Sequence, residues 1–181
     1  LFRSASADQR YEDSSLLHKA ISLNNPELIR FLIGYGAELT FNSESLGTPL
    51  IFALHRYFHR RLDTDVLYII LNAVNELEEN KKKQILNTPT EVGLFPIHGA
   101  IKCQDPDVLE FIIEMGANLN VCFFGLSILQ FAREFGSEEI FSIINGVFQD
   151  IFMESDLYRD LVYDRDYNSS YESSDSDDLL N

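Results

Sequence analysis

Residues 95–119 read FPIHGAIKCQDPDVLEFIIEMGANL, and residues 15–39 read SLLHKAISLNNPELIRFLIGYGAEL. The two stretches lie eighty positions apart and align without a gap. His18 returns as His98, both copies close on a glycine–alanine pair, and aliphatic residues recur between these points at the spacing of a buried helix face. Chance composition does not produce such register, so we expect a chain built from structural repeats.

Two further copies complete the pattern. TPLIFA at 48–53 lies thirty-three residues after SLLHKA at 15–20, and SILQFA at 127–132 lies thirty-two residues after FPIHGA at 95–100. A Ser/Thr-Pro-Leu-His-x-Ala motif at a spacing near thirty-three, closed by Gly-Ala-x-Leu-Asn, resembles the ankyrin repeat. The resemblance covers residues 13–146 and implies an all-α solenoid of about four helix-turn-helix repeats.

Individual residues favour helices independently of the resemblance. Pro49 and Pro96 fit a first helical turn, and Thr48 is a residue type that caps a helix N-terminus. Gly36 and Gly116 stand where a helix ends in a left-handed residue. Alanines keep the first helix of each repeat thin: Ala20, Ala53, Ala100 and Ala132. Buried stripes are expected on the second helices: Leu28, Phe31 and Leu32; Val66, Ile69 and Ile70; Val108, Phe111 and Ile112; Ile140, Ile143 and Ile144.

The second repeat contains two insertions. About five residues enter between its helices, around 56–64, and about nine more follow in the polar stretch 75–83, where the glycine–alanine turn is missing. Insertions in solenoids often mark the binding side. They are also tolerated as plain surface insertions, because lengthening a loop costs little free energy. Both interpretations stay open.

Length and composition predict one small domain with appendages. We expect an N-terminal extension at 1–12, repeats at 13–146 (about 13–44, 45–91, 92–123 and 124–146), a capping helix at 147–166 and an acidic disordered tail at 167–181. The chain does not begin with Met, which suggests a fragment or trimmed form of a longer protein. No apolar run is long enough to span a membrane. Cys103 and Cys122 are expected to be reduced thiols.

Negative charge is concentrated at the C-terminus. From Asp150 onward ten acidic residues accompany two arginines, so eight of the net fifteen negative charges lie in the last thirty-two residues. This balance argues against direct binding of nucleic acid or anionic membrane and favours basic protein surfaces. Three interpretations of the tail compete: phosphorylation at Ser174, in a context similar to casein kinase 2 substrates, an acidic dileucine sorting signal at 175–180, and a solubilising tail.

No residues assemble an active site, so we expect a protein that is not an enzyme and uses no cofactor and no metal. His55 and His59 are four residues apart and could share a metal on one helix, but arginines crowd them and no third ligand is near. A basic helix that faces a partner is the stronger interpretation. His18 and His98 occupy the motif histidine, which in ankyrin repeats ties a helix to the neighbouring loop by hydrogen bonds.

Recognition of another protein remains, and the ankyrin register places it on the concave face and on the loops between repeats, the fingers. Apolar aromatic side chains at positions that the repeat usually leaves polar are candidate anchors. The predicted partner-binding residues are Lys19, Leu23, Phe52, His55, Arg56, Phe131 and Phe135 on helices, with Phe41, Phe123 and Phe124 on fingers. The competing interpretation is that several of them fold back onto neighbouring repeats.

The sequence therefore predicts a protein–protein interaction module, cytoplasmic or nuclear in the producing cell or in a host, whose partner has a basic or mixed apolar surface. A composition rich in Ile, Phe, Asn and Tyr resembles ankyrin proteins of AT-rich genomes, such as intracellular bacteria and large DNA viruses, and suggests a host-directed effector or adaptor. One alternative is an inhibitor that masks a basic, nucleic-acid-binding surface of its partner, similar to ankyrin inhibitors of Rel-type transcription factors. Another is the targeting domain of a larger enzyme.

Overall fold

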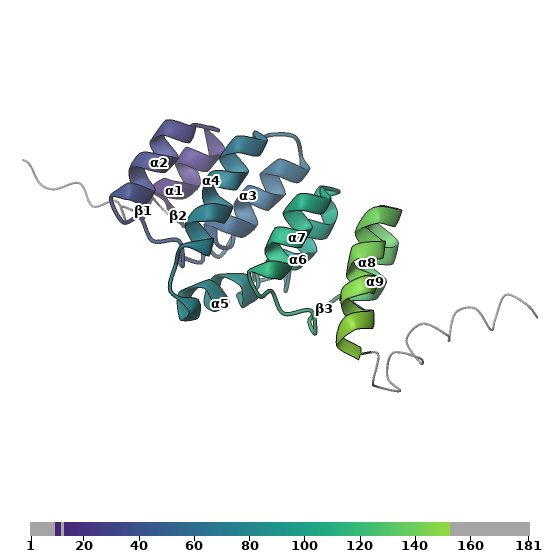
Figure 1. Cartoon of the computed structure of the whole chain (residues 1–181). Helices are drawn as coiled ribbons and strands as arrows, with labels where there is room; N and C mark the ends of the chain where they lie inside the picture. The colour runs from purple at the N-terminus through teal and green to yellow at the C-terminus, as the bar shows by residue number, and fades with distance from the viewer. Residues whose placement is uncertain (1–9, 12, 153–181) are drawn as a thin grey trace, which may run out of the picture. The chain divides into compact units, whose positions relative to one another are not determined.

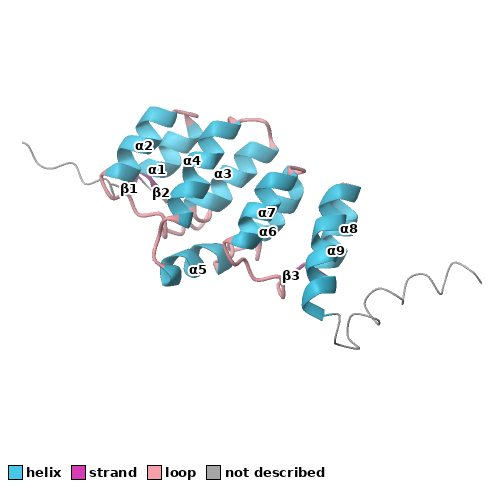
Figure 2. Ribbon diagram, viewed as in Figure 1, coloured by secondary structure: helices cyan, strands magenta, loops and turns pink. Residues whose placement is uncertain are grey.

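The computed structural model describes residues 10–11 and 13–152, and it confirms the all-α repeat solenoid (Figures 1 and 2). Its helices are α1 (Leu16–Ser22), α2 (Pro26–Gly34), α3 (Pro49–Phe58), α4 (Thr64–Asn75), α5 (Glu79–Asn87), α6 (Pro96–Cys103), α7 (Pro106–Glu114), α8 (Ile128–Phe135) and α9 (Glu138–Phe152). Two short antiparallel pairs accompany them: β1 (Arg10–Tyr11) with β2 (Ser14–Ser15), and β3 (Cys122–Phe123) with β4 (Leu126–Ser127). Across the described residues, no helix combines the length and the apolar character that a membrane span requires.

The chain divides after Ile143 into two compact units, and the stack of helical pairs belongs to the first unit. Each pair packs internally, α1 on α2, α3 on α4 and α6 on α7, and the first helices contact one another in series from α1 through α3 and α6 to α8 (Figure 1). Gly99 allows the close approach of α6 to α3, because a Cβ atom there would lie 3.3 Å from the Cβ of Leu54. The alanines of the first helices are fully buried, as expected: Ala20, Ala53, Ala100 and Ala132.

The helices begin where the sequence predicts. Thr48 accepts a hydrogen bond from the amide of Ile51 at the start of α3, and Pro49 and Pro96 occupy the first turns of α3 and α6. Side-chain caps also open α1, α2, α7 and α8, which satisfies amide groups that a helix leaves free at its N-terminus. Gly36 and Gly116 adopt φ values of 82° and 94°, which confirms the left-handed turns predicted after α2 and α7.

The stripe predicted for the second helices is wrong at its middle position. Phe31 is 55% exposed and stacks on Tyr35 at 4.4 Å between ring centroids, while the preceding turn buries Ile29 together with Leu32. Phe111 is likewise only half-buried and lies beside the ring of Tyr68 at 6.2 Å. Each second helix buries only a narrow face. The second residue of each predicted stripe, three positions after the first, lies at the edge of that face and is partly exposed to solvent.

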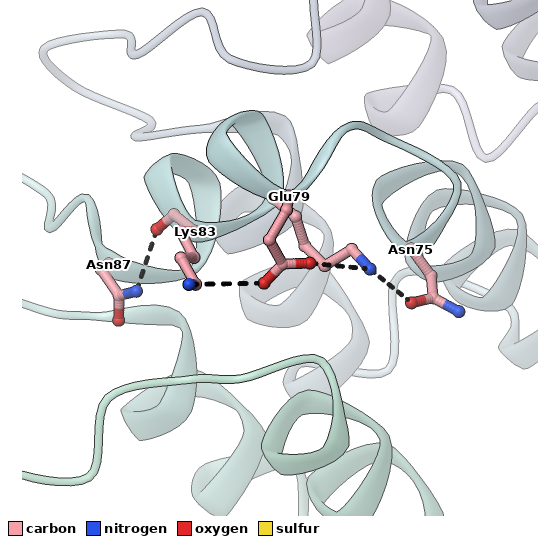
Figure 3. A network of polar contacts seen from close by, with 5 residues as sticks. Asn75, Glu79, Lys83 and Asn87 are labelled. Atoms are coloured by element: carbon pink, nitrogen blue, oxygen red, sulfur yellow. Dashed lines mark hydrogen bonds and ion pairs between the residues drawn. The ribbon is translucent and has the colours of Figure 1, made fainter.

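Both insertions of the second repeat are helical in part. The first extends α3 to ten residues, against seven in α1 and eight in α6, and widens the turn before α4. The second forms α5, which runs across the ends of the neighbouring helices (Figure 1) and buries Ile85 and Leu86. Glu79 holds the start of α5 through ion pairs with Lys82 at 3.8 Å and Lys83 at 3.7 Å (Figure 3).

Polar side chains connect α5 to its neighbours. Lys82 donates to the side chain of Asn75 on α4 at 3.2 Å, and Asn87 donates to the carbonyl of Lys83 at 2.9 Å (Figure 3). The side-chain oxygen of Asn87 accepts from the amide of Asn118 at 2.9 Å, in the loop that follows α7. The second insertion is therefore fastened to two repeats.

The C-terminal boundary differs from the prediction. Helix α9 continues through residues 145–147 without a break, so residues 147–152 extend the second helix of the fourth repeat and do not begin a helix of their own. Asn145 and Gly146 lie inside this helix, where a glycine costs about 1 kcal/mol relative to alanine and does not end it. The remainder of the predicted capping helix, 153–166, and the predicted tail, 167–181, lie outside the described residues.

Candidate protein-binding site

The first finger, residues 43–47, is shaped by the carboxylate of Asp13. That carboxylate accepts from the amides of Glu44 at 2.9 Å and Ser45 at 2.8 Å, and from the hydroxyls of Ser43 at 2.9 Å and Ser45 at 2.8 Å. The bonds from Ser45 and Glu44 hold the pKa of Asp13 well below its usual range. A carboxylate that remains charged therefore holds the turn, and the backbone bridge between Ser43 and Gly47 closes it.

His18 connects the first repeat to this finger. Its Nδ1 lies 2.8 Å from the Ser15 hydroxyl, and its Nε2 lies 3.1 Å from the carbonyl oxygen of Gly47, to which the Nε2–H donates. Burial lowers the pKa of His18, so the neutral ring that this geometry needs is favoured at neutral pH. The prediction that this histidine ties a helix to the neighbouring loop is confirmed.

A groove runs between the first finger and the second finger, residues 90–94. Gly47 adopts φ of 74°, and a Cβ atom there would lie 2.9 Å from Cγ2 of Thr90, so the two fingers are in contact at that point. The groove encloses about 390 Å³. The fingers contribute Glu44, Ser45, Leu46, Thr90, Glu91, Val92 and Leu94, and α3 contributes Ile51, Phe52 and His55.

The groove is apolar inside and acidic at its rim. Leu46, Phe52 and Leu94 are half-buried, and Val92 at the finger tip is 68% exposed. Glu44 and Glu91 are exposed, one on each finger. Such a surface suits an extended segment that offers an apolar side chain to the walls and cationic side chains to the rim.

The predicted partner-binding residues are divided by the structure among several places. Phe52 and His55 line the groove, and Phe41 lies nearby, with its ring edge against His18 at 5.9 Å. Lys19 on α1 and Leu23 directly after it are exposed and do not line the groove. Burial lowers the pKa of His55, and nearby cations lower it further.

The prediction that Phe131 binds a partner at the surface is wrong. Phe131 is only 1% exposed, and its ring packs edge-on against His98 at 4.8 Å. The ring of Phe131 on α8 also lies beside the rings of Phe123 and Phe135, at 5.9 Å and 4.6 Å between centroids. Phe131 thus belongs to the core, as the competing fold-back interpretation holds.

The third finger separates two adjacent aromatic residues. Phe123 packs on His98 at 5.4 Å and on Phe131 at 5.9 Å, whereas Phe124 is 85% exposed with φ of 49°. The tight turn between β3 and β4 produces this split, since consecutive residues there point to opposite sides. Phe124 is the more exposed anchor of the pair.

The other two predicted residues lie at the opposite ends of the first helices. Arg56 donates to the carbonyl oxygens of Ser22 at 2.9 Å and Arg61 at 3.1 Å, so it links the end of α1 to the turn after α3. Phe135 is 44% exposed at the end of α8. Neither side chain lines the finger groove, although the guanidinium of Arg56 lies 5.9 Å from the ring centroid of Phe52 in the groove wall.

His98 departs from the pattern of His18. Its Nδ1 accepts from the Phe95 amide at 3.1 Å, but its Nε2, buried with the whole residue, meets no acceptor among the described residues. Aromatic rings surround it instead, those of Phe123 and Phe131. Within the described part of the chain, the hydrogen bond from the motif histidine to the next finger is therefore present in the first repeat and absent in the third.

Most groove residues of the fingers are missing from the sequence prediction. Val92, Leu94 and Leu46 lie beside Gly93 and Gly47, directly before the Pro-containing starts of α6 and α3. That pattern of glycine followed by a helix start is a signal that could have identified both fingers. The insertions pointed instead to residues 56–64 and 75–83, which do not line the groove.

Other hollows and side-chain clusters of the described residues are weaker candidates for a binding site. A larger hollow of about 660 Å³ lies between the outer helices α2 and α4, but charged and amide side chains line much of it, including Arg30, Asp65 and Glu76. The described residues contain no cluster of three or more His, Cys, Asp or Glu side chains that could hold a metal ion. Cys103 and Cys122 are free thiols.

Comparison with known protein families agrees with this geometry. The family model described as Ankyrin repeat matches residues 12–41, the stretch that holds Asp13, His18, α1 and α2. No curated protein matches the chain. The match supports an ankyrin-repeat protein, and helical pairs like α1 and α2 recur along the described part of the chain. Ankyrin repeats are typically non-enzymatic modules for protein–protein interaction.

Proposed function

We propose that this protein binds a partner protein through the finger groove, which lies along α3 between the first and second fingers, without catalysing a reaction. The supporting observation is the groove itself: an apolar trough of about 390 Å³ with Glu44 and Glu91 at its rim. The partner segment would place an aliphatic or aromatic side chain between Phe52 and Val92 and direct Lys or Arg side chains to the two carboxylates. Phe124 on the third finger is a second anchor.

The test compares partners captured by the whole protein and by two variants with equal charge change. Val92→Asp places a carboxylate at the groove, and Tyr35→Asp places one on α2, where Tyr35 is 72% exposed. Quantitative mass spectrometry should show proteins retained by the wild type and by Tyr35→Asp, and depleted about tenfold by Val92→Asp. Equal recovery from both variants would contradict the assignment of the groove.

The bound segment is identified in a second step. A photo-crosslinking amino acid at position 92 should join to the captured partner, and the crosslinked peptide should contain an apolar residue flanked by Lys or Arg. A crosslinked segment rich in Asp and Glu would contradict the charge pattern proposed for the rim.

A second candidate function rests on the charge of the C-terminal residues. Ten acidic residues from Asp150 onward could occupy a basic surface of the partner and block its access to nucleic acid. Raising the salt concentration and deleting residues 167–181 would each weaken such binding, whereas binding through the finger groove would survive both. We place the protein in the cytoplasm or nucleus, where two free cysteines remain reduced.

A further inference from the structure

A cationic surface occupies the end of the helices that faces away from the fingers. The turns after α3 and α6 lie at one end of the stack, opposite to α5 (Figure 1). Four basic side chains gather there, together with two exposed aromatic rings. We name this surface the basic turn edge, and its residues are Arg56, Phe58, His59, Arg61, Lys102 and Phe135.

Contacts across three repeats make this edge one surface. The ammonium group of Lys102 lies 5.3 Å from the ring centroid of Phe58 and 5.9 Å from that of Phe135, so it bridges α3 and α8 from α6. The ring of His59 lies 4.7 Å from that of Phe58. The side chain of Gln104 donates to the carbonyl oxygen of Phe135, which joins the end of α6 to the end of α8.

No ion pair among the described residues joins the cations of the edge to a carboxylate, although Asp63 and Asp105 lie in the same two turns. The two ion pairs of the described residues both involve Glu79 on α5. Neither includes Arg56, Arg61 or Lys102. These cations are close enough together to act jointly on His55, whose pKa is lowered first by burial and then by the charges around it. Cations that gather on a chain of net charge −15 offer carboxylates of a partner a place that most of this chain does not.

We infer that the basic turn edge binds an acidic segment of a partner protein, with carboxylates on Arg61 and Lys102 and an apolar side chain on the exposed face of Phe58 or Phe135, beside the Lys102 ammonium that lies near both rings. Both rings are partly open to this role, with Phe58 38% and Phe135 44% exposed. A short peptide fits better than nucleic acid, because an extended phosphate backbone would pass from this small edge onto an acidic surface. The inference does not rest on the function proposed for the finger groove, although Arg56 of the edge lies 5.9 Å from the ring centroid of Phe52 in the groove wall.

The test measures binding of a labelled synthetic peptide, rich in Asp and Glu with a central Phe, to the full chain by fluorescence anisotropy. The edge variant is Arg61→Gln with Lys102→Gln, and its matched control is Lys81→Gln with Lys83→Gln on α5, which changes the net charge equally. The dissociation constant should rise about tenfold in the edge variant and change less than about twofold in the control. Val92→Asp should leave probe binding unchanged, which separates this test from that of the groove.

Several outcomes would overturn the inference. One is an absence of probe binding to the wild type, or equal weakening by both double variants. Another is equal binding of a single-stranded oligonucleotide at the same edge. Concentration-dependent self-association that the edge variant abolishes would assign the edge to a second copy of the chain. Probe binding that appears only after Asp175, Asp177 and Asp178 are changed to Asn would assign it to the chain's own acidic residues.

Discussion

The unmatched nitrogen of His98 should make the stability of this protein fall in mild acid. Because Nδ1 accepts from the amide of Phe95, the proton of the neutral ring lies on Nε2, which faces the rings of Phe123 and Phe131. A second proton would place a full charge in this apolar site. Burial accordingly lowers the pKa of His98 to about 4.

The size of the effect follows from the two pKa values. In the unfolded chain the group titrates near 6.5, so below that pH the unfolded state binds more protons than the folded state. The stabilisation is therefore complete above pH 6.5 and declines as the pH falls towards 4. With these values, acidification from pH 7.5 to pH 5 should cost about 2 kcal/mol of unfolding free energy through His98 alone.

Urea unfolding followed by circular dichroism at pH 7.5 and pH 5 measures this loss. His98→Gln removes the titration, and His59→Gln is the control, since His59 is exposed. His18 is present in all three proteins, so its contribution cancels in the comparison. Wild type and His59→Gln should each lose about 2 kcal/mol more than His98→Gln. If His98→Gln loses as much as the wild type, the argument from the buried ring is refuted.

Three further predictions concern other parts of the stack. Leu54→Ala leaves a cavity where α3 meets α6, so the unfolding free energy measured in urea should fall by about 3 kcal/mol, because Leu54 is fully buried. Asp13→Asn removes the charge that holds the first finger, so hydrogen exchange of the Ser45 amide should accelerate about tenfold, while unchanged exchange would show that the turn holds without it. Cys122 is exposed and should react with iodoacetamide in the native protein, whereas Cys103, whose pKa burial raises to about 12, should react only after unfolding.

Helix starts and repeat register could be read from the sequence because they depend on local chemistry. Pro49 and Pro96 lack an amide hydrogen and so prefer the first helical turn, whatever the helix packs against. Gly36 and Gly116 tolerate positive φ regardless of their neighbours. These features need no knowledge of the rest of the molecule, and the structure shows them where they were predicted.

Which aromatic residues face solvent could not be read in the same way. Phe131 is buried and Phe124 exposed, although both occupy apolar-rich stretches of similar sequence. Phe131 is buried because its ring packs against that of His98 from the preceding repeat, and Phe124 is exposed because of the tight turn of the third finger. Likewise, the apolar walls of the groove come from two fingers about forty-five residues apart, a contact that local periodicity does not contain.

The insertion between α3 and α4 is held in a way that a merely tolerated loop would not require. On one side, Arg56 donates to the carbonyl of Ser22 in the first repeat at 2.9 Å. On the other, the Tyr57 hydroxyl donates to the carboxylate of Asp105 in the third repeat at 2.6 Å, and burial together with this bond raises the pKa of Tyr57. The lengthened α3 is thus fixed against both neighbours, and it carries Phe52 into the groove at one end and Phe58 to the basic turn edge at the other. Because both surfaces share one rigid helix, a partner could engage them together without first ordering the loop, and the entropy cost of binding would be small.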